Sequence, residues 1–167
     1  MAKDTIDAII TEIIHDEGDS VTTNDPTDPG GRTQFGISER SNPEAWLDGK
    51  ITEPEAREIY RRKYVLYPKF NLIPSSHAKI QAQIIDFGVH SGQYTAIMKL
   101  QGILKQTEDG VLGPKTMAAL IATDPKTINN MLVEARIRMI ARVVQRQPIQ
   151  LSKLYGFIDR AYSFFIF

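Results

Sequence analysis

The sequence predicts a mainly α-helical protein with one small β or irregular element near its front. Apolar residues recur at helical spacing along most of the chain, strand-like alternation is almost absent, and turn-forming residues gather in residues 19–38. The 167 residues include 42% hydrophobic and 24% charged side chains. These proportions are typical of a globular chain that buries a core of its own.

The first expected helix has isoleucines at the i, i+3, i+4, i+7 and i+8 positions of one face and ends at Gly18. These isoleucines are Ile6, Ile9, Ile10, Ile13 and Ile14. Residues 19–38 are dense in Asn, Asp, Pro, Gly and Thr, which predicts turns and a short hairpin.

Two helices are expected next. One begins at Pro43, with Ser41 or Asn42 as its cap. The other begins with a capping box, Thr52 and Glu55. Its tyrosines, which we expect to be buried along one side, are Tyr60, Tyr64 and Tyr67, and Pro68 ends it.

The rest of the chain predicts five more helices, over residues 76–91, 94–105, 115–123, 126–146 and 151–165. The long helix 126–146 begins after Asp124 and carries a predicted buried stripe of Ile128, Leu132, Ala135, Met139 and Val143. The apolar end of the chain, S-F-F-I-F, is expected to dock on the core.

Charge is unevenly distributed although the net charge is zero. Residues 1–60 contain 14 acids and 5 bases, and residues 61–167 contain 6 acids and 15 bases. The asymmetry indicates either two faces with different roles or two halves that attract each other. A basic stripe on the long helix, Arg138, Arg142 and Arg146, is either a solvated face or a surface for an anionic cell wall.

Composition excludes several classes of site. The chain has no cysteine, which rules out disulfides, thiolate nucleophiles and cysteine metal sites, and it has no H-E-x-x-H zinc motif. We expect no metal and no cofactor. No apolar run reaches the roughly 20 residues that span a bilayer. The first residues carry acids among their isoleucines, unlike a signal peptide, so synthesis in a host cytoplasm is expected.

Glu17 is the first candidate for chemistry. It follows Ile6 by eleven positions, which places it about 20° from that residue around the helix, on the apolar face. It also lies in the last turn, where the helix dipole disfavours a negative charge. Both effects favour the protonated carboxylic acid that a general acid needs. The alternative is that Glu17 turns outward or pairs with a base.

The segment after Glu17 supplies a second possible carboxylate. Asp25 and Asp28 lie on a Pro- and Gly-rich loop, followed by polar side chains at Thr33, Gln34 and Ser38. An acid at a helix end that faces a loop with another carboxylate is the two-carboxylate arrangement of glycoside hydrolysis.

The same segment resembles a known family. E-G, V and then N-D-P-x-D-P-G-G-x-T-x-x-G-I, over residues 17–37, is similar to the motif of glycoside-hydrolase family 108, the phage endolysins and bacterial N-acetylmuramidases. Further motifs match in order: E-A-x-x-I-Y-R-x-x-Y at 55–64, D-x-x-V-x-S-G at 86–92, L-Q at 100–101, D-G-V-L-G-P-x-T at 109–116 and G-[aromatic]-x-x-R-A at 156–161.

The resemblance implies a lysozyme-like α+β fold that cleaves the β-1,4 bond between N-acetylmuramic acid and N-acetylglucosamine. It makes Glu17 the catalytic acid. The second carboxylate is Asp28 by our choice, with Asp25 as the alternative, and Thr33 is expected to position water. The expected substrate contacts are Asn24, Asp25, Gln34, Phe35, His90 and Ser91. One of the three tyrosines is a candidate for stacking on a sugar. Asp86 is either a substrate contact or a buried structural acid bonded to backbone amides, and we favour the structural role.

The resemblance also divides the chain into a catalytic lobe, 1–92, and a helical peptidoglycan-binding lobe, 93–167, packed as one unit. The sequence departs from the family at Asp19 and Ser20, where a glycine and an aromatic residue are usual, at an insertion of Thr22 and Thr23, and at His90 and Phe157, where Asn and Trp are usual. These departures leave Asp25 and Asp28 open as the second carboxylate.

The function expected from sequence is therefore that of a phage endolysin, an antimicrobial muramidase that acts on the periplasmic cell wall. Its expected partners are peptidoglycan glycan strands, without nucleic acid or stable membrane insertion, and the protein is expected to be a monomer. Two alternatives stay open. One is a lytic transglycosylase, which needs only the glutamate, and the other is a non-catalytic wall-binding or secretion-helper protein.

Overall fold

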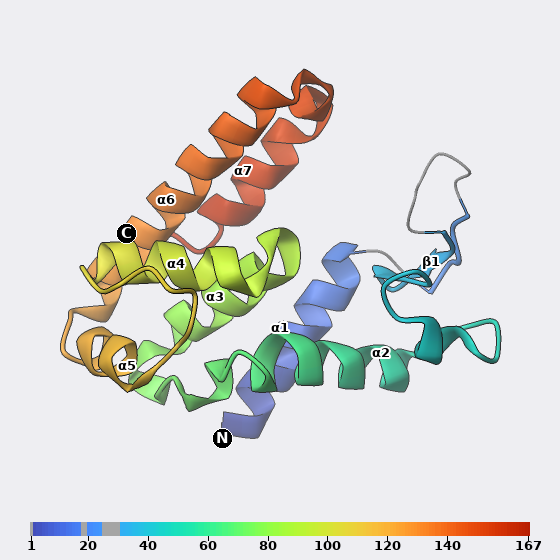
Figure 1. Cartoon of the computed structure of the whole chain (residues 1–167), viewed down its shortest axis with the longest axis horizontal. Coiled ribbons are helices and arrows are strands. Elements are labelled where there is room, and N and C mark those ends of the chain that lie inside the picture. The colour runs from blue at the N-terminus through green and yellow to red at the C-terminus, as the bar shows by residue number, and fades with distance from the viewer. Residues whose placement is uncertain (1, 18–19, 25–30) are drawn as a thin grey trace. The chain divides into compact units, whose positions relative to one another are not determined.

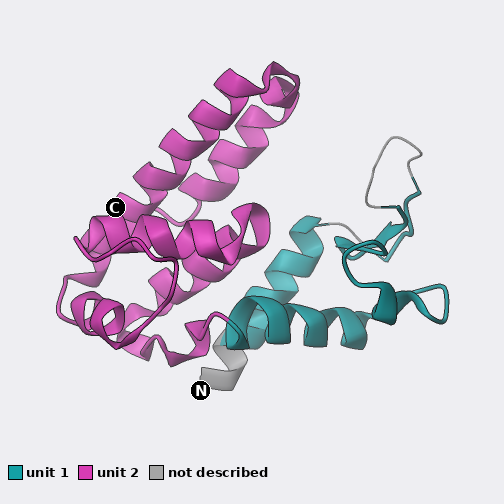
Figure 2. Cartoon of the chain, viewed as in Figure 1, with its two compact units in different colours: residues 1–67 teal, residues 68–167 magenta. Residues whose placement is uncertain are grey.

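The computed structural model describes residues 2–17, 20–24 and 31–167 (Figure 1). Seven α-helices, several short 3-10 or π-helical segments and one two-stranded antiparallel sheet make up these described parts. The predicted class, mainly helical with a small hairpin after the first helix, is confirmed. The chain divides into two compact units, Met1–Tyr67 and Pro68–Phe167 (Figure 2).

In the first unit, helix α1 (Ala2–Glu17) buries the predicted isoleucine face and packs against α2 (Glu53–Tyr60). The capping box of α2 is present, because the Glu55 carboxylate accepts hydrogen bonds from the Thr52 backbone N–H at 2.7 Å and from the Thr52 hydroxyl at 2.6 Å. Helix α2 continues without a break into a π-helix, Arg61–Leu66.

The hairpin lies between α1 and α2 in the sequence. Strands β1 (Thr33–Gln34) and β2 (Ile37–Ser38) pair Thr33 with Ser38 and Gln34 with Ile37. Phe35 and Gly36 form the turn with φ of 51° and 72°, the left-handed pair that a tight two-residue hairpin requires. Thr23 extends the ladder, since its backbone N–H and carbonyl exchange hydrogen bonds with Thr33 at 2.8 and 2.9 Å.

Two predictions for this unit were wrong in detail. The helix expected at Pro43 is only a short 3-10 segment, Pro43–Trp46. The three tyrosines do not share one buried side: Tyr60 is 3% exposed, Tyr64 is half-buried and Tyr67 is 83% exposed. The π-helix between them has a wider turn than an α-helix, so α-helical spacing misplaces the residue at its end.

The second unit is helical throughout its named elements: α3 (Ala78–Ser91), α4 (Gln93–Ile103), α5 (Pro114–Ile121), α6 (Pro125–Arg146), α7 (Leu154–Tyr162) and 3-10 segments Phe70–Leu72, Ser75–His77 and Pro148–Lys153. Helix α6 packs against the other four α-helices. Asp124 caps it, because its carboxylate accepts the Thr127 backbone N–H at 2.7 Å. The predicted helices are confirmed within two or three residues at most ends.

The buried stripe of α6 differs from the prediction. Ile128 and Leu132 are buried as expected, but Ala135 and Met139 are only half-buried and Val143 is 40% exposed. The buried face comprises Ile128, Asn129, Leu132, Val133, Arg136, Ile140 and Val144. The prediction failed because it considered only apolar residues, whereas Arg136, a charged residue, lies in the middle of the buried face.

Arg136 is buried together with an acid and a second arginine. Its guanidinium Nη1 lies 2.6 Å from Asp86 Oδ2, and Arg160 Nε donates to Asp86 Oδ1 at 2.8 Å. The Arg136 side chain is 0% exposed and lies over the Phe87 ring, 5.2 Å from its centroid. Asp86 is therefore the buried structural acid that was expected, with arginines as partners in place of backbone amides, and it joins α3, α6 and α7.

The loop between α4 and α5 is organised by Gln101, which is buried. Its amide N–H group donates to the carboxylate of Asp109 at 2.7 Å, the carbonyl of Val111 at 3.0 Å and the hydroxyl of Thr116 at 3.2 Å. Its amide oxygen accepts the Gly110 N–H at 2.9 Å. The L-Q and D-G-V-L-G-P-x-T motifs thus form one hydrogen-bonded loop.

The last residues dock on α6, as predicted. Asn129 Nδ2 donates to the Phe164 carbonyl at 2.7 Å. The Asn130 side chain donates to the Ile166 carbonyl at 2.8 Å and accepts the Ile166 N–H at 3.0 Å.

None of the helices in the described part of the chain combines the length and the apolar character that a membrane span requires.

Candidate active site

Glu17 is the last residue of α1 and is half-buried. Its stem lies against the hairpin turn, since a Cβ built on Gly36 would stand only 2.7 Å from the Glu17 Cβ and 3.5 Å from its Cγ. Only glycine fits here, because any side chain at residue 36 would occupy the space of the glutamate. The predicted inward orientation of Glu17 is consistent with this packing.

Tyr60 holds the turn from the other side. The buried Tyr60 hydroxyl donates a hydrogen bond to the Phe35 carbonyl at 2.9 Å. The same hydroxyl oxygen lies 2.7 Å from the position that a Gly36 Cβ would take. The turn is therefore wedged between the end of α1 and the end of α2.

Tyr64 lies one helical turn beyond Tyr60, with the two ring centroids 5.7 Å apart. Burial raises the pKa of the Tyr64 hydroxyl, and the negative charge of Glu17 raises it further. The Tyr64 hydroxyl is therefore neutral near pH 7 and able to donate a hydrogen bond. Lys63 places its ammonium group 5.7 Å from the Tyr64 ring centroid.

These groups border a small pocket of about 110 Å³ within the first unit. Its walls are Gly36, Ile37, Ser38, Ser41, Asn42, Ile59, Tyr60, Lys63 and Tyr64. Pockets that enclose a drug-sized ligand are typically about 300–1,000 Å³. This pocket is therefore too small to enclose a whole ligand of that size.

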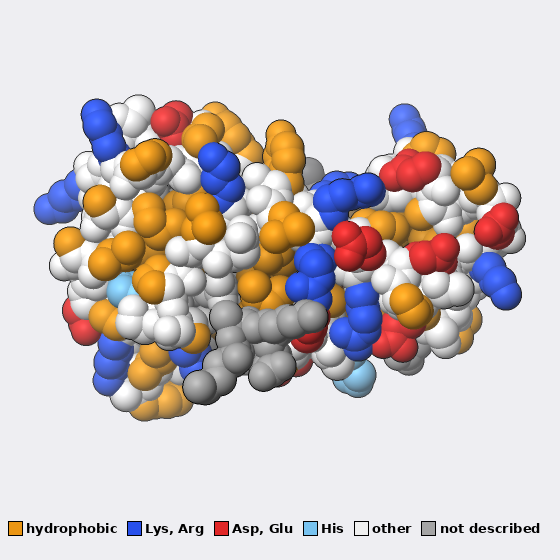
Figure 3. All heavy atoms as spheres, turned by 90° about the horizontal axis from the view of Figure 1, so that it is seen from below, with side chains coloured by type: hydrophobic (Ala, Val, Ile, Leu, Met, Phe, Trp, Pro, Cys, Tyr) orange, Lys and Arg blue, Asp and Glu red, His pale blue; other side chains and the backbone are white. Residues whose placement is uncertain are grey.

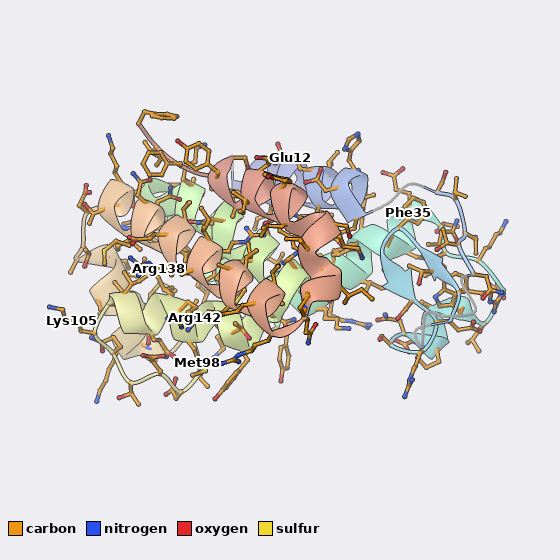
Figure 4. All side chains as sticks on the ribbon, turned by 90° about the horizontal axis from the view of Figure 1, so that it is seen from above. Glu12, Phe35, Met98, Lys105, Arg138 and Arg142 are labelled. Carbon is orange, nitrogen blue, oxygen red and sulfur yellow. The ribbon has the colours of Figure 1, made fainter. Side chains whose placement is uncertain are left out.

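Several residues that the sequence analysis placed at the site lie on or next to the hairpin. Thr33 is half-buried and pairs across the hairpin with Ser38, which lines the pocket, so both lie on one face of the hairpin. Asn24 is exposed next to Thr23. The Phe35 ring is buried at the turn, where Figure 4 labels it.

Gln34 has a structural role, because both ends of its side-chain amide bond to backbone groups. Its Nε2 donates to the Ser20 carbonyl at 2.7 Å, and its Oε1 accepts the Ile51 N–H at 2.8 Å. Both ends of the buried amide thus join the hairpin to neighbouring backbone. Contacts of Gln34 and Phe35 with substrate stay predictions.

Asp25 and Asp28 lie outside the described residues. The described residues on either side, Thr23 and Thr33, pair with each other, and β1 leads directly into the turn that covers Glu17. The choice between the two aspartates stays a prediction.

His90 and Ser91 lie in the second unit, at the end of α3. His90 Nδ1 is 3.0 Å from the Ser91 hydroxyl, and the His90 ring packs edge-on to Phe157 at 4.7 Å between centroids. They line a pocket of about 420 Å³ with side chains of α4, α6 and α7. Their expected role as substrate contacts stays a prediction.

Acids and bases alternate over the surface of the first unit. Four of the arginines in its described part form ion pairs: Arg32 with Glu39, Arg57 with Glu53, Arg61 with Asp7 and Arg62 with Glu44. Figure 3 shows red and blue side chains next to one another on its right-hand side. The acidic excess of residues 1–60 is therefore partly neutralised by ion pairs with nearby arginines.

Among the described residues, no group of His, Asp and Glu could hold a metal ion.

The sequence analysis named one of the three tyrosines as a candidate for stacking on a sugar, but it did not single out Tyr60, Tyr64 or Lys63. The available signal was the E-A-x-x-I-Y-R-x-x-Y motif, in which both tyrosines stand four apart. We interpreted that spacing as core packing. The contacts of Gly36 show instead that the Tyr60 hydroxyl and the stem of Glu17 lie on either side of the same turn.

Comparisons with known proteins agree with this geometry. A family model described as glycosyl hydrolase 108 matches residues 10–92. The structure of Brucella abortus SagA is similar, with a TM-score of 0.70 and 27% sequence identity, over 97% of this chain and 96% of that chain. No curated protein matches the sequence.

Proposed function

Residues 10–92 belong to the glycosyl hydrolase 108 family, and from this premise we propose that the protein is a muramidase that cuts peptidoglycan. The bond is the β-1,4 linkage between N-acetylmuramic acid and N-acetylglucosamine. Membership of the family makes the chain a glycoside hydrolase. The particular bond is our inference from the site and from the motifs of residues 17–37.

One observation carries the proposal: a half-buried glutamate at a helix end, packed against a glycine turn beside a polar pocket. Cleavage of a glycosidic bond requires a proton on the departing oxygen, and a carboxylic acid in a partly desolvated site can deliver it. Glu17 protonates that oxygen. The carboxylate that remains can then accept a proton from water.

The second carboxylate comes from the segment after Glu17. Asp28 is our choice, with Asp25 as the alternative, to stabilise the oxocarbenium-like transition state or to orient water. Thr33 is proposed to position that water, because its place opposite Ser38 puts it on the pocket-bordering face of the hairpin.

The natural substrate would be the glycan strand of the bacterial cell wall, and the biological role that of an endolysin acting on the periplasmic wall. We propose a monomer, with residues 93–167 as a wall-binding lobe. Direct involvement of Gln101, Asp109 and Thr116 in wall binding is not needed, because their side chains hold the α4–α5 loop together.

Digestion of purified peptidoglycan tests the activity. Fragments are separated and their reducing ends identified by mass spectrometry, with the Glu17→Gln variant as control. Muramic acid at the reducing ends supports hydrolysis as proposed. Anhydro-muramic ends would identify a lytic transglycosylase, N-acetylglucosamine ends a different bond, and no fragments a binding protein.

The two aspartates are compared in the same assay. Asp28→Ala is expected to lower the rate more than Asp25→Ala, which we place in a turn-capping role. The reverse order would assign the catalytic place to Asp25. Full activity in both variants would contradict the two-carboxylate mechanism.

A further inference from the structure

We propose that Tyr64 contacts the substrate beside Glu17 and that Tyr60 is the positioning residue that keeps Glu17 in place. The inference rests on the proposed function of the Glu17 site and adds two residues to it. It starts from the end of α2, where the chain changes from an α-helix to a π-helix.

The first step concerns the place of the tyrosines. π-helical segments are rare and frequently occur at functional sites. Here the π-helix, Arg61–Leu66, begins directly after Tyr60 and contains Tyr64, and both tyrosines line the pocket. Tyr67 follows the end of the π-helix and is exposed.

The second step concerns Tyr60. Its hydroxyl bonds the Phe35 carbonyl, and this bond fixes the turn whose Gly36 backbone lies on the Glu17 stem. Loss of the hydroxyl would free a carbonyl in a buried position and let the turn move. The Glu17 stem would then lose its contact with the Gly36 turn. The other residues that line the pocket, where we propose that the glycan binds, would stay in place.

The third step concerns Tyr64. Its hydroxyl belongs to a half-buried side chain in the pocket wall, close enough to Glu17 to be affected by its charge. A neutral phenol of this kind can donate a hydrogen bond to a hydroxyl or carbonyl oxygen of a sugar. Its ring also presents an apolar face to a pyranose ring. Tyr64 is therefore suited to hold the sugar that Glu17 protonates.

Conservative variants separate the two roles. Tyr60→Phe and Tyr64→Phe each remove one hydroxyl and keep the ring, and Tyr67→Phe is the matched control on an exposed tyrosine. Rates are measured on soluble peptidoglycan fragments, each at a fixed interval below the variant's melting temperature. Binding of the same fragments is measured by calorimetry in the Glu17→Gln background, where no turnover is expected to interfere.

Tyr60→Phe is expected to lower kcat about tenfold with little change in KM or affinity, because it displaces the acid and not the sugar. Tyr64→Phe is expected to lower kcat/KM about tenfold and to weaken fragment binding by a similar factor. Tyr67→Phe should change neither. A Tyr64→Phe variant that binds and turns over like Tyr67→Phe overturns the substrate contact, and an unchanged kcat in Tyr60→Phe overturns its positioning role.

Failure of the proposed function has a different signature. If the parent protein releases no fragments, the muramidase assignment is wrong, and the binding measurement still decides the contact. Fragment binding that is lost in Tyr64→Phe and kept in Tyr67→Phe supports Tyr64 as a glycan contact without catalysis. No binding by the parent overturns both proposals.

Discussion

The two units both contain motifs with polar side chains, but these side chains lie in different environments. In residues 1–67, the motif side chains of Tyr60 and Tyr64 line a polar pocket with Gly36, and the stem of Glu17 packs against the Gly36 turn. In residues 68–167, the motif side chains of Asp86 and Gln101 are buried and bond other parts of the same unit.

The difference shows that polar residues in a family motif do not by themselves mark a site of chemistry. A carboxylate such as Asp86, between two arginine side chains, has its charge neutralised inside the protein. A carboxylate such as Glu17, at a helix end and half-buried, is partly exposed to solvent. The direction of each side chain and the identity of its partners decide between the two uses.

The largest effect is expected for Glu17→Gln. The near-isosteric change should preserve the fold and abolish almost all activity, because general acid catalysis is typically worth about 10²–10⁴-fold. The melting temperature should hold or rise, since a partly desolvated acid at the negative end of α1 is removed. Turnover of peptidoglycan and thermal unfolding are the measurements, and Glu12→Gln on the exposed side of α1 is the control. Retention of more than about a tenth of the activity would show that a residue other than Glu17 is the general acid.

Asp86→Ala should have the largest effect on stability. It leaves Arg136 and Arg160 without their shared carboxylate in a buried position, and breaking a buried ion pair costs about 3–5 kcal/mol. Urea unfolding measures the loss, with Asp159→Ala, an exposed acid in α7, as the control. A normal free energy of unfolding with a reduced kcat would instead make Asp86 part of the active site.

Gly36→Ala should affect both activity and stability. The new methyl group would meet the Glu17 Cβ and the Tyr60 hydroxyl at 2.7 Å, and φ of 72° is strained for alanine. We expect a loss of at least tenfold in kcat. Gly49→Ala is the matched control, because Gly49 has φ of 78° but its nearest neighbour, the Arg32 Nη1 atom, would be 3.7 Å away. Equal kcat losses in both variants would mean that backbone strain, and not contact with Glu17, is responsible.

Gln101→Ala should weaken the second unit without changing the chemistry. It leaves the Gly110 N–H and the Thr116 hydroxyl without their partner, at a cost of about 1–3 kcal/mol. Gln101 also lowers the pKa of Asp109, so the stability from this bond is present above the unfolded-state pKa, near 3.8, and is lost as pH falls through the lower folded-state value. The parent should therefore lose part of its stability advantage over Gln101→Ala in acid, while the part from the Gly110 and Thr116 bonds remains.

Unfolding curves at neutral pH and below pH 4 measure this effect. Gln106→Ala, which removes only a 3.3 Å bond to the Leu104 carbonyl, is the control. A drop in kcat with unchanged stability would show instead that the loop takes part in the reaction.

Sequence predicted the helices of both units well, because their signals are local. The isoleucine face of α1, the capping box at Thr52 and the Asp124 cap each follow from residues within one or two turns. The direction of the Glu17 side chain could also be predicted, since it depends only on the period of α1.

The failures arose where distant residues decide the outcome. Arg136 is buried because Asp86, fifty residues earlier, supplies a counter-charge, and no local pattern shows this. Tyr67 lies away from the other two tyrosines because α2 changes to a π-helix, and Tyr60 lies next to Glu17 because the Gly36 turn comes between them. Helical periodicity describes one element at a time, and both features require two or more.

The smallest effect is expected for the basic stripe of α6. Arg138 and Arg142 lie along one flank of the helix (Figure 4), but Arg138 is already paired with Glu134 at 2.5 Å, and both of these side chains are largely exposed. If the stripe guides the enzyme to anionic cell wall, activity on permeabilised cells should fall between about 0.01 M and about 0.15 M salt, where the Debye length shrinks from about 30 Å to about 8 Å. Replacing Arg138, Arg142 and Arg146 with glutamine should flatten this dependence.

The control removes the same charge elsewhere in the second unit, by replacing Lys79, Lys115 and Lys153 with glutamine. Turnover of a small uncharged oligosaccharide should be unchanged in both triple variants, because the proposed acid and its pocket lie in the first unit. A flatter salt curve in the arginine variant alone would show that the stripe attracts the wall locally. Equal flattening in both would assign the attraction to the net charge of the unit, and no change in either would leave the arginines as a solvated helix face.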